Sequence, residues 1–142
     1  MTGDDFLDVA RTLAARPDSS EAFHRTAVSR AYYGAFHLAR GLLSGMGFSV
    51  GRNHAIPLRW LTVCGEVNAR EVGKLLTDLQ AERIKADYDL ATTRFRQRKL
   101  AEEFVALAYE IKRLIDVCTR EPARSAIKAG IEAYQRKITG KP

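Results

Sequence analysis

The chain has 142 residues, of which 46% are hydrophobic and 28% charged, and its formal net charge at pH 7 is +6. These values are ordinary for one globular domain that is large enough to bury its own core. No apolar run is long enough to cross a membrane and the start is acidic, so we expect a cytoplasmic protein without a membrane partner. The cysteines and histidines lack metal-ligand or redox spacing, so no metal and no cofactor is expected.

The positive charge is unevenly placed along the chain. Residues 1–51 carry five basic and five acidic side chains, so the excess lies in the remainder. It is concentrated in residues 94–99 and 120–141. Such clustering favours an anionic partner such as RNA or a phosphate, and the alternative is a solvated surface that keeps the protein soluble.

The first third of the chain predicts two helices. Apolar residues at helical spacing indicate a short amphipathic helix over residues 4–15, which Pro17 ends. Asp18 and Glu21 have the spacing of a capping box, which would open a long helix ending near Ser44. Small residues alternate with large apolar ones along it, as in the central helix of a bundle.

The middle of the chain predicts a turn, a short element and another long helix. Three glycines in residues 45–51 indicate the turn, and a short helical element follows over residues 53–61. Asn68 and Glu71 repeat the capping-box spacing. Apolar residues at helical spacing then continue to about Asp87.

The clearest periodicity covers residues 100–118, where apolar side chains step by four and three along one face. Pro122 interrupts it, and a last helix is predicted over residues 123–138, with a disordered end after it. No alternating strand pattern occurs. The sequence therefore predicts an all-α bundle of four main helices in residues 1–120, followed by a C-terminal helical extension. The C-terminal helix and tail, residues 121–142, are assigned to the same domain.

A polar stripe lies on the long second helix. Arg30, Tyr33 and His37 are spaced so that all three leave the same helical face. Buried polar groups without partners cost about 1–3 kcal/mol each, so the stripe needs partners. Arg83, Asp87 and Tyr88 are the candidates on the next long helix, and Arg83 and Asp87 share a face because they are four residues apart.

These side chains include the groups needed to bind a phosphodiester and to transfer protons. Arginine binds phosphodiester oxygens, histidine transfers protons near neutral pH, and tyrosine or aspartate orients either. RNA supplies its own nucleophile, the 2′-hydroxyl, so cleavage would need no metal. The alternatives are a hydrogen-bonded core role for His37 and an ion pair of about 0.3–0.5 kcal/mol for Arg83. His54, in a loop-like segment, is either a ligand contact or a surface histidine.

Two stretches resemble the HEPN superfamily. Residues 29–43 read SRAYYGAFHLARGLL and residues 82–89 read ERIKADYD, which is similar to the small stand-alone, UPF-type branch of that family. The resemblance covers about residues 5–118. It implies an all-α, up-and-down bundle of four to five helices, a homodimer, and a toxin or ribonuclease of a toxin–antitoxin or defence module. The partner implied most often is a nucleotidyltransferase-type (MNT) antitoxin.

The sequence departs from the catalytic signature of that family, which is an arginine followed after four to six residues by histidine on the later helix. Counting from Arg83, four intervening residues lead to Tyr88, so the usual histidine is absent. Arg30 and His37 have six residues between them but lie on the earlier helix. The spacing there is a coincidence unless that helix faces the same cleft as Arg83.

Two hypotheses follow. In the first, the protein acts on RNA or a nucleotide: the arginines hold phosphate, His37 handles protons, and the tyrosines and Asp87 orient them. In the second, it is a non-catalytic module that docks onto a nucleotidyltransferase or another partner. The residues assigned catalytic roles are His37, Arg83 and Tyr88. Those assigned to nucleic-acid or phosphate binding are Arg30, Tyr33, Asp87 and His54.

Overall fold

The computed structural model describes residues 1–140, and all regular structure in that range is helical. The elements are α1 (Gly3–Ala15), α2 (Glu21–Gly45), α3 (Ala55–Val63), α4 (Val67–Tyr88), the 3-10 turn η1 (Arg94–Arg96), α5 (Arg98–Cys118) and α6 (Ala123–Thr139). The predicted all-α bundle with a C-terminal helix is confirmed. Within residues 1–140, no helix combines the length and apolar character needed to cross a membrane.

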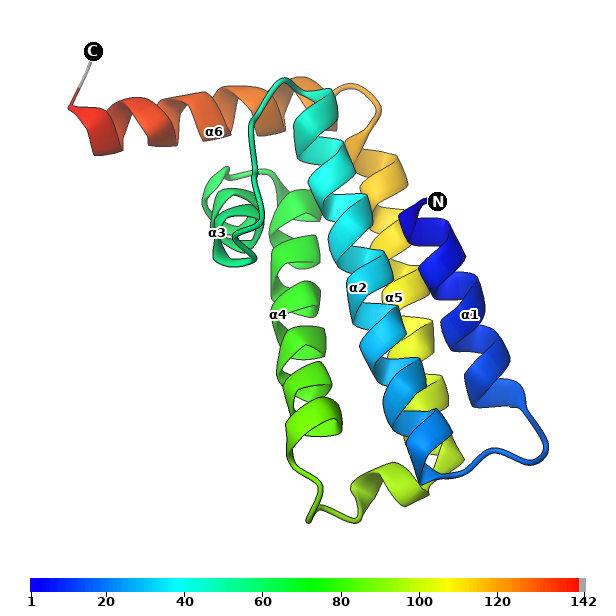
Figure 1. The fold of residues 1–142 in the computed structure, drawn as a ribbon. Helices are drawn as coiled ribbons and strands as arrows, with labels where there is room; N and C mark the ends of the chain where they lie inside the picture. The colour runs from blue at the N-terminus through cyan, green and yellow to red at the C-terminus, as the bar shows by residue number, and fades with distance from the viewer. Residues whose placement is uncertain (141–142) are drawn as a thin grey trace.

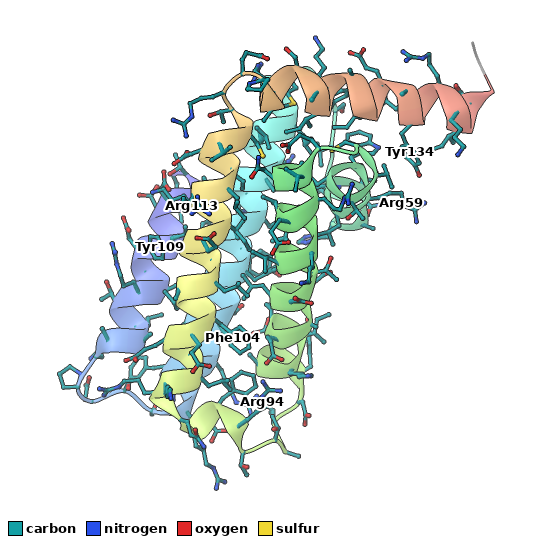
Figure 2. All side chains as sticks on the ribbon, turned by 180° about the vertical axis from the view of Figure 1, so that it is seen from behind. Arg59, Arg94, Phe104, Tyr109, Arg113 and Tyr134 are labelled. Atoms are coloured by element: carbon teal, nitrogen blue, oxygen red, sulfur yellow. The ribbon has the colours of Figure 1, made fainter. Side chains whose placement is uncertain are left out.

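Four helices run side by side in alternating directions, and α2 lies in the middle of them (Figure 1). It packs against α1, α4 and α5, while the short α3 packs against α4. On the far side from Figure 1, the Tyr109 hydroxyl of α5 donates a hydrogen bond to the Asp8 carboxylate of α1 at 3.0 Å (Figure 2). Helix α6 crosses the end of the bundle and extends away from it.

Small residues allow α2 to sit at the centre. A Cβ at Gly34 would lie 2.9 Å from the Gly3 carbonyl oxygen and 2.6 Å from a methyl carbon of Leu7. Only glycine therefore permits this close crossing of α1 and α2. On the other faces, alanines let neighbouring helices approach in the same way. The fully buried alanines of α2 are Ala27, Ala31, Ala35 and Ala39.

The predicted capping box at the start of α2 is wrong. The helix begins at Glu21 with Ser20 as its N-cap, in extended conformation. The Asp18 carboxylate is instead held by the guanidinium of Arg16, through two hydrogen bonds of 3.0 Å each. This bidentate pair lowers the pKa of Asp18 and leaves the carboxylate unavailable to the helix.

The start predicted for α4 is also shifted. Its N-cap is Glu66, whose Oε2 accepts a hydrogen bond from the Ala69 backbone N–H at 2.7 Å. Asn68 lies inside the first turn, where its side-chain amide donates to Glu66 Oε1 at 2.9 Å. A glutamate can cap a helix in this way because its carboxylate also complements the helix dipole.

The end of the chain differs in part from the predicted disorder. Thr139 is the last residue of α6, and Gly140 follows it with φ +67°, the left-handed conformation that often ends a helix. The disordered end was predicted to continue through residues 141–142, which lie outside the described residues.

Helix α6 is attached to the bundle through Gly130. A Cβ at this position would overlap the backbone carbonyl of Cys64 at the end of α3, so α6 and α3 touch through backbone atoms. The fully buried Ile127 and Ile131 flank this contact on the same helix. The attachment therefore depends on the absence of a side chain at Gly130.

We expect Gly130→Ala to lower the free energy of unfolding by about 1–2 kcal/mol. Overpacking of about 1–3 kcal/mol would outweigh the gain in helix propensity of up to about 1 kcal/mol. The control is Gly41→Ala in α2, where a Cβ meets nothing within 4 Å and the same substitution should stabilise the protein. Urea unfolding of both variants measures the difference. Equal stabilisation by both would contradict the close contact.

Candidate functional site

Two arginines from different helices meet over one tyrosine ring. The guanidinium carbons of Arg30, on α2, and Arg83, on α4, lie 5.3 and 5.5 Å from the centroid of the Tyr33 ring. Arg83 also lies 5.3 Å from the Tyr32 ring, and Arg30 lies 5.5 Å from the Phe6 ring of α1. Aromatic faces attract cations, so these rings hold both guanidinium groups in place. The two sequence motifs therefore form one cluster.

One carboxylate accompanies this pair of cations. Asp87 forms an ion pair with Arg83 at 3.5 Å, with side chains 30% and 12% exposed, and accepts a 3.3 Å hydrogen bond from the Ser29 hydroxyl. The Nε atoms of Arg30 and Arg83 are buried and have no hydrogen-bond partner within residues 1–140. The cluster thus carries positive charge and donor groups that the described residues do not satisfy.

His54 borders the same cluster from the segment between α2 and α3. Its ring stacks on Phe36 with a centroid distance of 4.0 Å and an interplanar angle of 7°, and its Nδ1 lies 2.7 Å from the Tyr32 hydroxyl. It meets the Tyr33 ring edge to face at 6.1 Å. Burial, and then the nearby Arg83 cation, lower the pKa of His54. The imidazole is therefore mainly neutral at pH 7.

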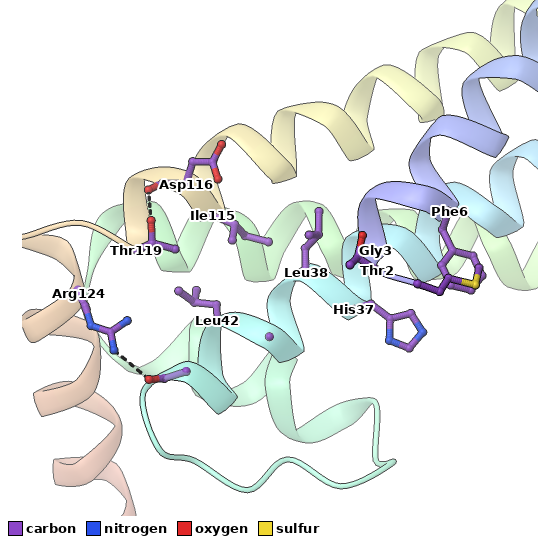
Figure 3. Close-up of a pocket in the computed structure, with 13 residues that line it drawn as sticks. Thr2, Gly3, Phe6, His37, Leu38, Leu42, Ile115, Asp116, Thr119 and Arg124 are labelled. Atoms are coloured by element: carbon purple, nitrogen blue, oxygen red, sulfur yellow. Dashed lines mark hydrogen bonds between the residues drawn. The ribbon is translucent and has the colours of Figure 1, made fainter.

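His37 lies at the edge of the cluster. Its ring stacks on Phe6 at 5.4 Å, and Phe6 also contacts the Arg30 guanidinium. The ring is exposed and lines a cavity of about 680 Å³ that runs along α2, between the start of α1, the end of α5 and the start of α6 (Figure 3). At the other end of that cavity, Arg124 donates a hydrogen bond to the Gly45 carbonyl at 2.9 Å. Burial, and then Arg40, lower the pKa of His37.

Tyr88 is not brought into the cluster. It is the last residue of α4 and 74% exposed. Five residues after Arg83, it is turned about 140° around the helix from that arginine. Within residues 1–140, no ring contact, hydrogen bond or ion pair joins it to the other candidate residues. The other six candidates all touch at least one neighbouring member of the cluster or its aromatic walls.

Sequence reasoning missed Arg25, which is 8% exposed. Its guanidinium donates hydrogen bonds to the carbonyls of Ala86, at 2.9 Å, and Thr92, at 3.1 Å, and pairs with Glu21 at 3.0 Å. These bonds hold the last turn of α4, which carries Asp87. The Glu21–Arg25 spacing, an i,i+4 pair on a largely apolar helix, is the sequence signal that indicates a fixed arginine here.

Two of the four basic side chains in the run at 94–99, Arg94 and Arg98, bind other parts of the bundle. Arg94 forms an ion pair with Glu82 at 2.9 Å at the end of the bundle opposite α6 (Figure 2). Arg98 donates hydrogen bonds to the backbone carbonyls of Arg16, at 2.7 Å, and Pro17, at 3.2 Å. These two arginines tie the segment after α4 to the rest of the bundle. Arg96 and Lys99 are the exposed basic side chains of the run.

The cluster of Arg30, Tyr33, Arg83, Asp87 and His54 can bind an anionic oxygen ligand. Guanidinium forks match phosphate oxygens, and a neutral imidazole can donate or accept a proton near neutral pH. Among residues 1–140, no group of three or more His, Cys, Asp or Glu side chains is arranged to hold a metal ion.

Comparison with known proteins identifies the family. The HEPN domain family model matches residues 6–118, which include both motifs and end at the last residue of α5. Helix α6 lies beyond the match. Neither the curated proteins nor the solved structures compared with the chain gave a match. Because the family model covers most of the chain, the protein belongs to the HEPN domain family.

Proposed function

We propose that this HEPN-domain protein binds RNA through its phosphates, with Arg30 and Arg83 as the phosphate ligands. The observation that carries the proposal is the pair of guanidinium groups over the Tyr33 ring, accompanied by the single carboxylate of Asp87. Arginine presents several N–H donors in a planar fork that fits phosphate oxygens. Asp87 pairs with Arg83, so a bound phosphate would balance the positive charge of Arg30.

Aromatic rings beside the arginines favour single-stranded RNA. The stacked rings of Phe6 and His37 lie next to Arg30, and the His37 ring is exposed. Bases of single strands stack on such rings while arginines follow the backbone. The net charge of +6 adds a general attraction.

We assign proton transfer to His37. A neutral imidazole accepts a proton, and the lowered pKa of His37 keeps most of this side chain neutral at pH 7. His37 would take the 2′-hydroxyl proton as the 2′-oxygen bonds to the phosphorus. The P–O5′ bond then breaks, and the departing 5′-oxygen takes a proton from water or from the protonated His37, so no metal is needed. In this role the protein is a toxin-type component of a toxin–antitoxin or defence module, and Asp87 orients Arg83.

The experiment is binding and cleavage of a labelled single-stranded RNA in EDTA by the wild type, Arg83→Ala and His37→Ala. We expect Arg83→Ala to weaken binding at least tenfold, because a charge-assisted hydrogen bond contributes about 1.5–3 kcal/mol. His37→Ala should fail to cut even at a protein concentration that saturates the RNA, and it should bind more weakly by the loss of one stacking ring, about 1–3 kcal/mol. Arg113→Ala, an exposed arginine paired with Glu110, is the control. Unchanged binding by Arg83→Ala would refute the proposal.

A second candidate function is docking onto a nucleotidyltransferase-type antitoxin, and an exposed apolar patch favours it. Ile84 and Tyr88, one turn apart at the end of α4, and Leu90, two residues after the helix, are 46%, 74% and 75% exposed. Exposed apolar patches of this kind mark protein interfaces. The homodimer expected for the family could use the same patch. Mass measurement in solution, alone and with the antitoxin, tests both, and Ile84→Glu should abolish the assembly that forms.

A further inference from the structure

The His54 ring is held in one orientation by three aromatic side chains. It lies flat against Phe36, with centroids 4.0 Å apart, and edge to face against Tyr33 at 6.1 Å. Its Nδ1 is 2.7 Å from the hydroxyl oxygen of Tyr32, a residue with no exposed surface. One ring nitrogen therefore faces a buried phenol, and the other, Nε2, has no hydrogen-bond partner within residues 1–140.

The direction of the Tyr32–His54 hydrogen bond follows from what a buried phenol can do. Burial raises the pKa of Tyr32 to about 12, so the phenol keeps its proton at pH 7. A buried hydroxyl that does not donate this proton would leave a polar group unsatisfied. Within residues 1–140, the hydroxyl has one hydrogen-bond partner, the Nδ1 atom of His54 at 2.7 Å. The acceptor for the phenolic proton is therefore Nδ1 of His54.

We propose that Tyr32 is a positioning residue that fixes His54 with its proton on Nε2, so that His54 donates a hydrogen bond to an RNA phosphate oxygen beside Arg83. A neutral imidazole has one N–H, so an Nδ1 that accepts leaves the proton on Nε2. Both His54 and Arg83 contact the rings of Tyr32 and Tyr33, so the two side chains border the same pair of rings.

This inference rests on the proposed RNA binding, and it gives the two histidines different roles: His54 binds phosphate and His37 transfers protons. An Nε2 that carries the proton cannot act as a base, so His54 holds the phosphate in place. His37, which has no hydrogen bond to a described side chain, remains the proton acceptor. The tautomer itself does not depend on RNA and is testable in the free protein.

The first test is two-bond ¹H–¹⁵N NMR of the histidine rings in the wild-type protein at pH 7.5, with His54 assigned from His54→Gln. We expect the shift of a protonated nitrogen at Nε2 and that of an unprotonated nitrogen at Nδ1. Tyr32→Phe should move both shifts toward the average of the two tautomers. A wild-type His54 protonated on Nδ1 would overturn the proposal, whether or not Tyr32→Phe folds.

The second test uses two amides that replace different ring nitrogens. His54→Gln carries its amide near the position of Nε2, and His54→Asn carries it near that of Nδ1. We expect His54→Asn to weaken RNA binding about tenfold and His54→Gln to weaken it clearly less. Equal losses would overturn the role of the Nε2 donor. Unchanged RNA binding by Arg83→Ala would refute the proposed phosphate site. The NMR measurement of the His54 tautomer would still be valid, because it uses the free protein.

Discussion

Arg25→Ala is expected to lower the free energy of unfolding by about 3 kcal/mol, the largest effect of any single substitution considered. The arginine is buried, and its removal leaves the carbonyls of Ala86 and Thr92 without their donor and Glu21 without its nearest cation. Loss of one partner from a buried charged network has an effect of about 3–5 kcal/mol, and the partial exposure of Glu21 places this one at the low end. Urea unfolding measures it.

A matched control separates burial from charge. Arg11→Ala removes an arginine that pairs with Asp8 at 3.3 Å, but both side chains are about two-thirds exposed. An exposed pair contributes about 0–1 kcal/mol, so this variant should remain close to the wild type. Similar stabilities of the Arg25→Ala and Arg11→Ala variants would contradict the proposed structural role of Arg25 at the end of α4.

The double variant Arg30→Gln/Arg83→Gln is expected to bind single-stranded RNA about 100-fold more weakly than the wild type, because it removes two charge-assisted phosphate contacts. Each phosphate contact also contributes about 0.7 to the slope of log affinity against log salt for single strands. We therefore expect the slope to become shallower by about 1.4. Fluorescence anisotropy at several salt concentrations gives both values.

The control for this variant removes the same charge elsewhere. Arg11→Gln/Arg113→Gln changes two exposed arginines that already pair with Asp8 and Glu110. It should weaken binding only through the lower net charge. If the two double variants lose affinity and salt dependence equally, RNA is held by overall charge and not by the Arg30–Arg83 pair.

The helices were predictable because each buries a wide apolar face, and that face repeats along the sequence over many residues. The capping residues were not. Asp18 and Asn68 have the right spacing for capping boxes, yet Asp18 binds Arg16 and Asn68 binds Glu66. Spacing shows which side chains could cap a helix, but not which of them another neighbour already holds.

The candidate site was predictable where it follows helical periodicity. The stripe of Arg30 and Tyr33 faces Arg83, as the need for partners indicated. Tyr88 was predicted to be catalytic because it occupies the position of the histidine in the family signature. It lies on a different face of α4 from Arg83 and is exposed. The roles of Arg25 and Tyr32 depend on contacts with backbone carbonyls and with a loop histidine, which a sequence pattern does not encode.

The central claim, that RNA phosphate binds at the arginine pair, is tested most directly by NMR of the arginine Nε–H groups during titration with a short single-stranded RNA. We predict that the Nε–H signals of Arg30 and Arg83 shift furthest, since a phosphate bound to either guanidinium group changes the environment of the whole group. The signals of Arg11 and Arg113 should shift little. Binding of RNA that leaves the Arg30 and Arg83 signals unchanged would contradict the claim.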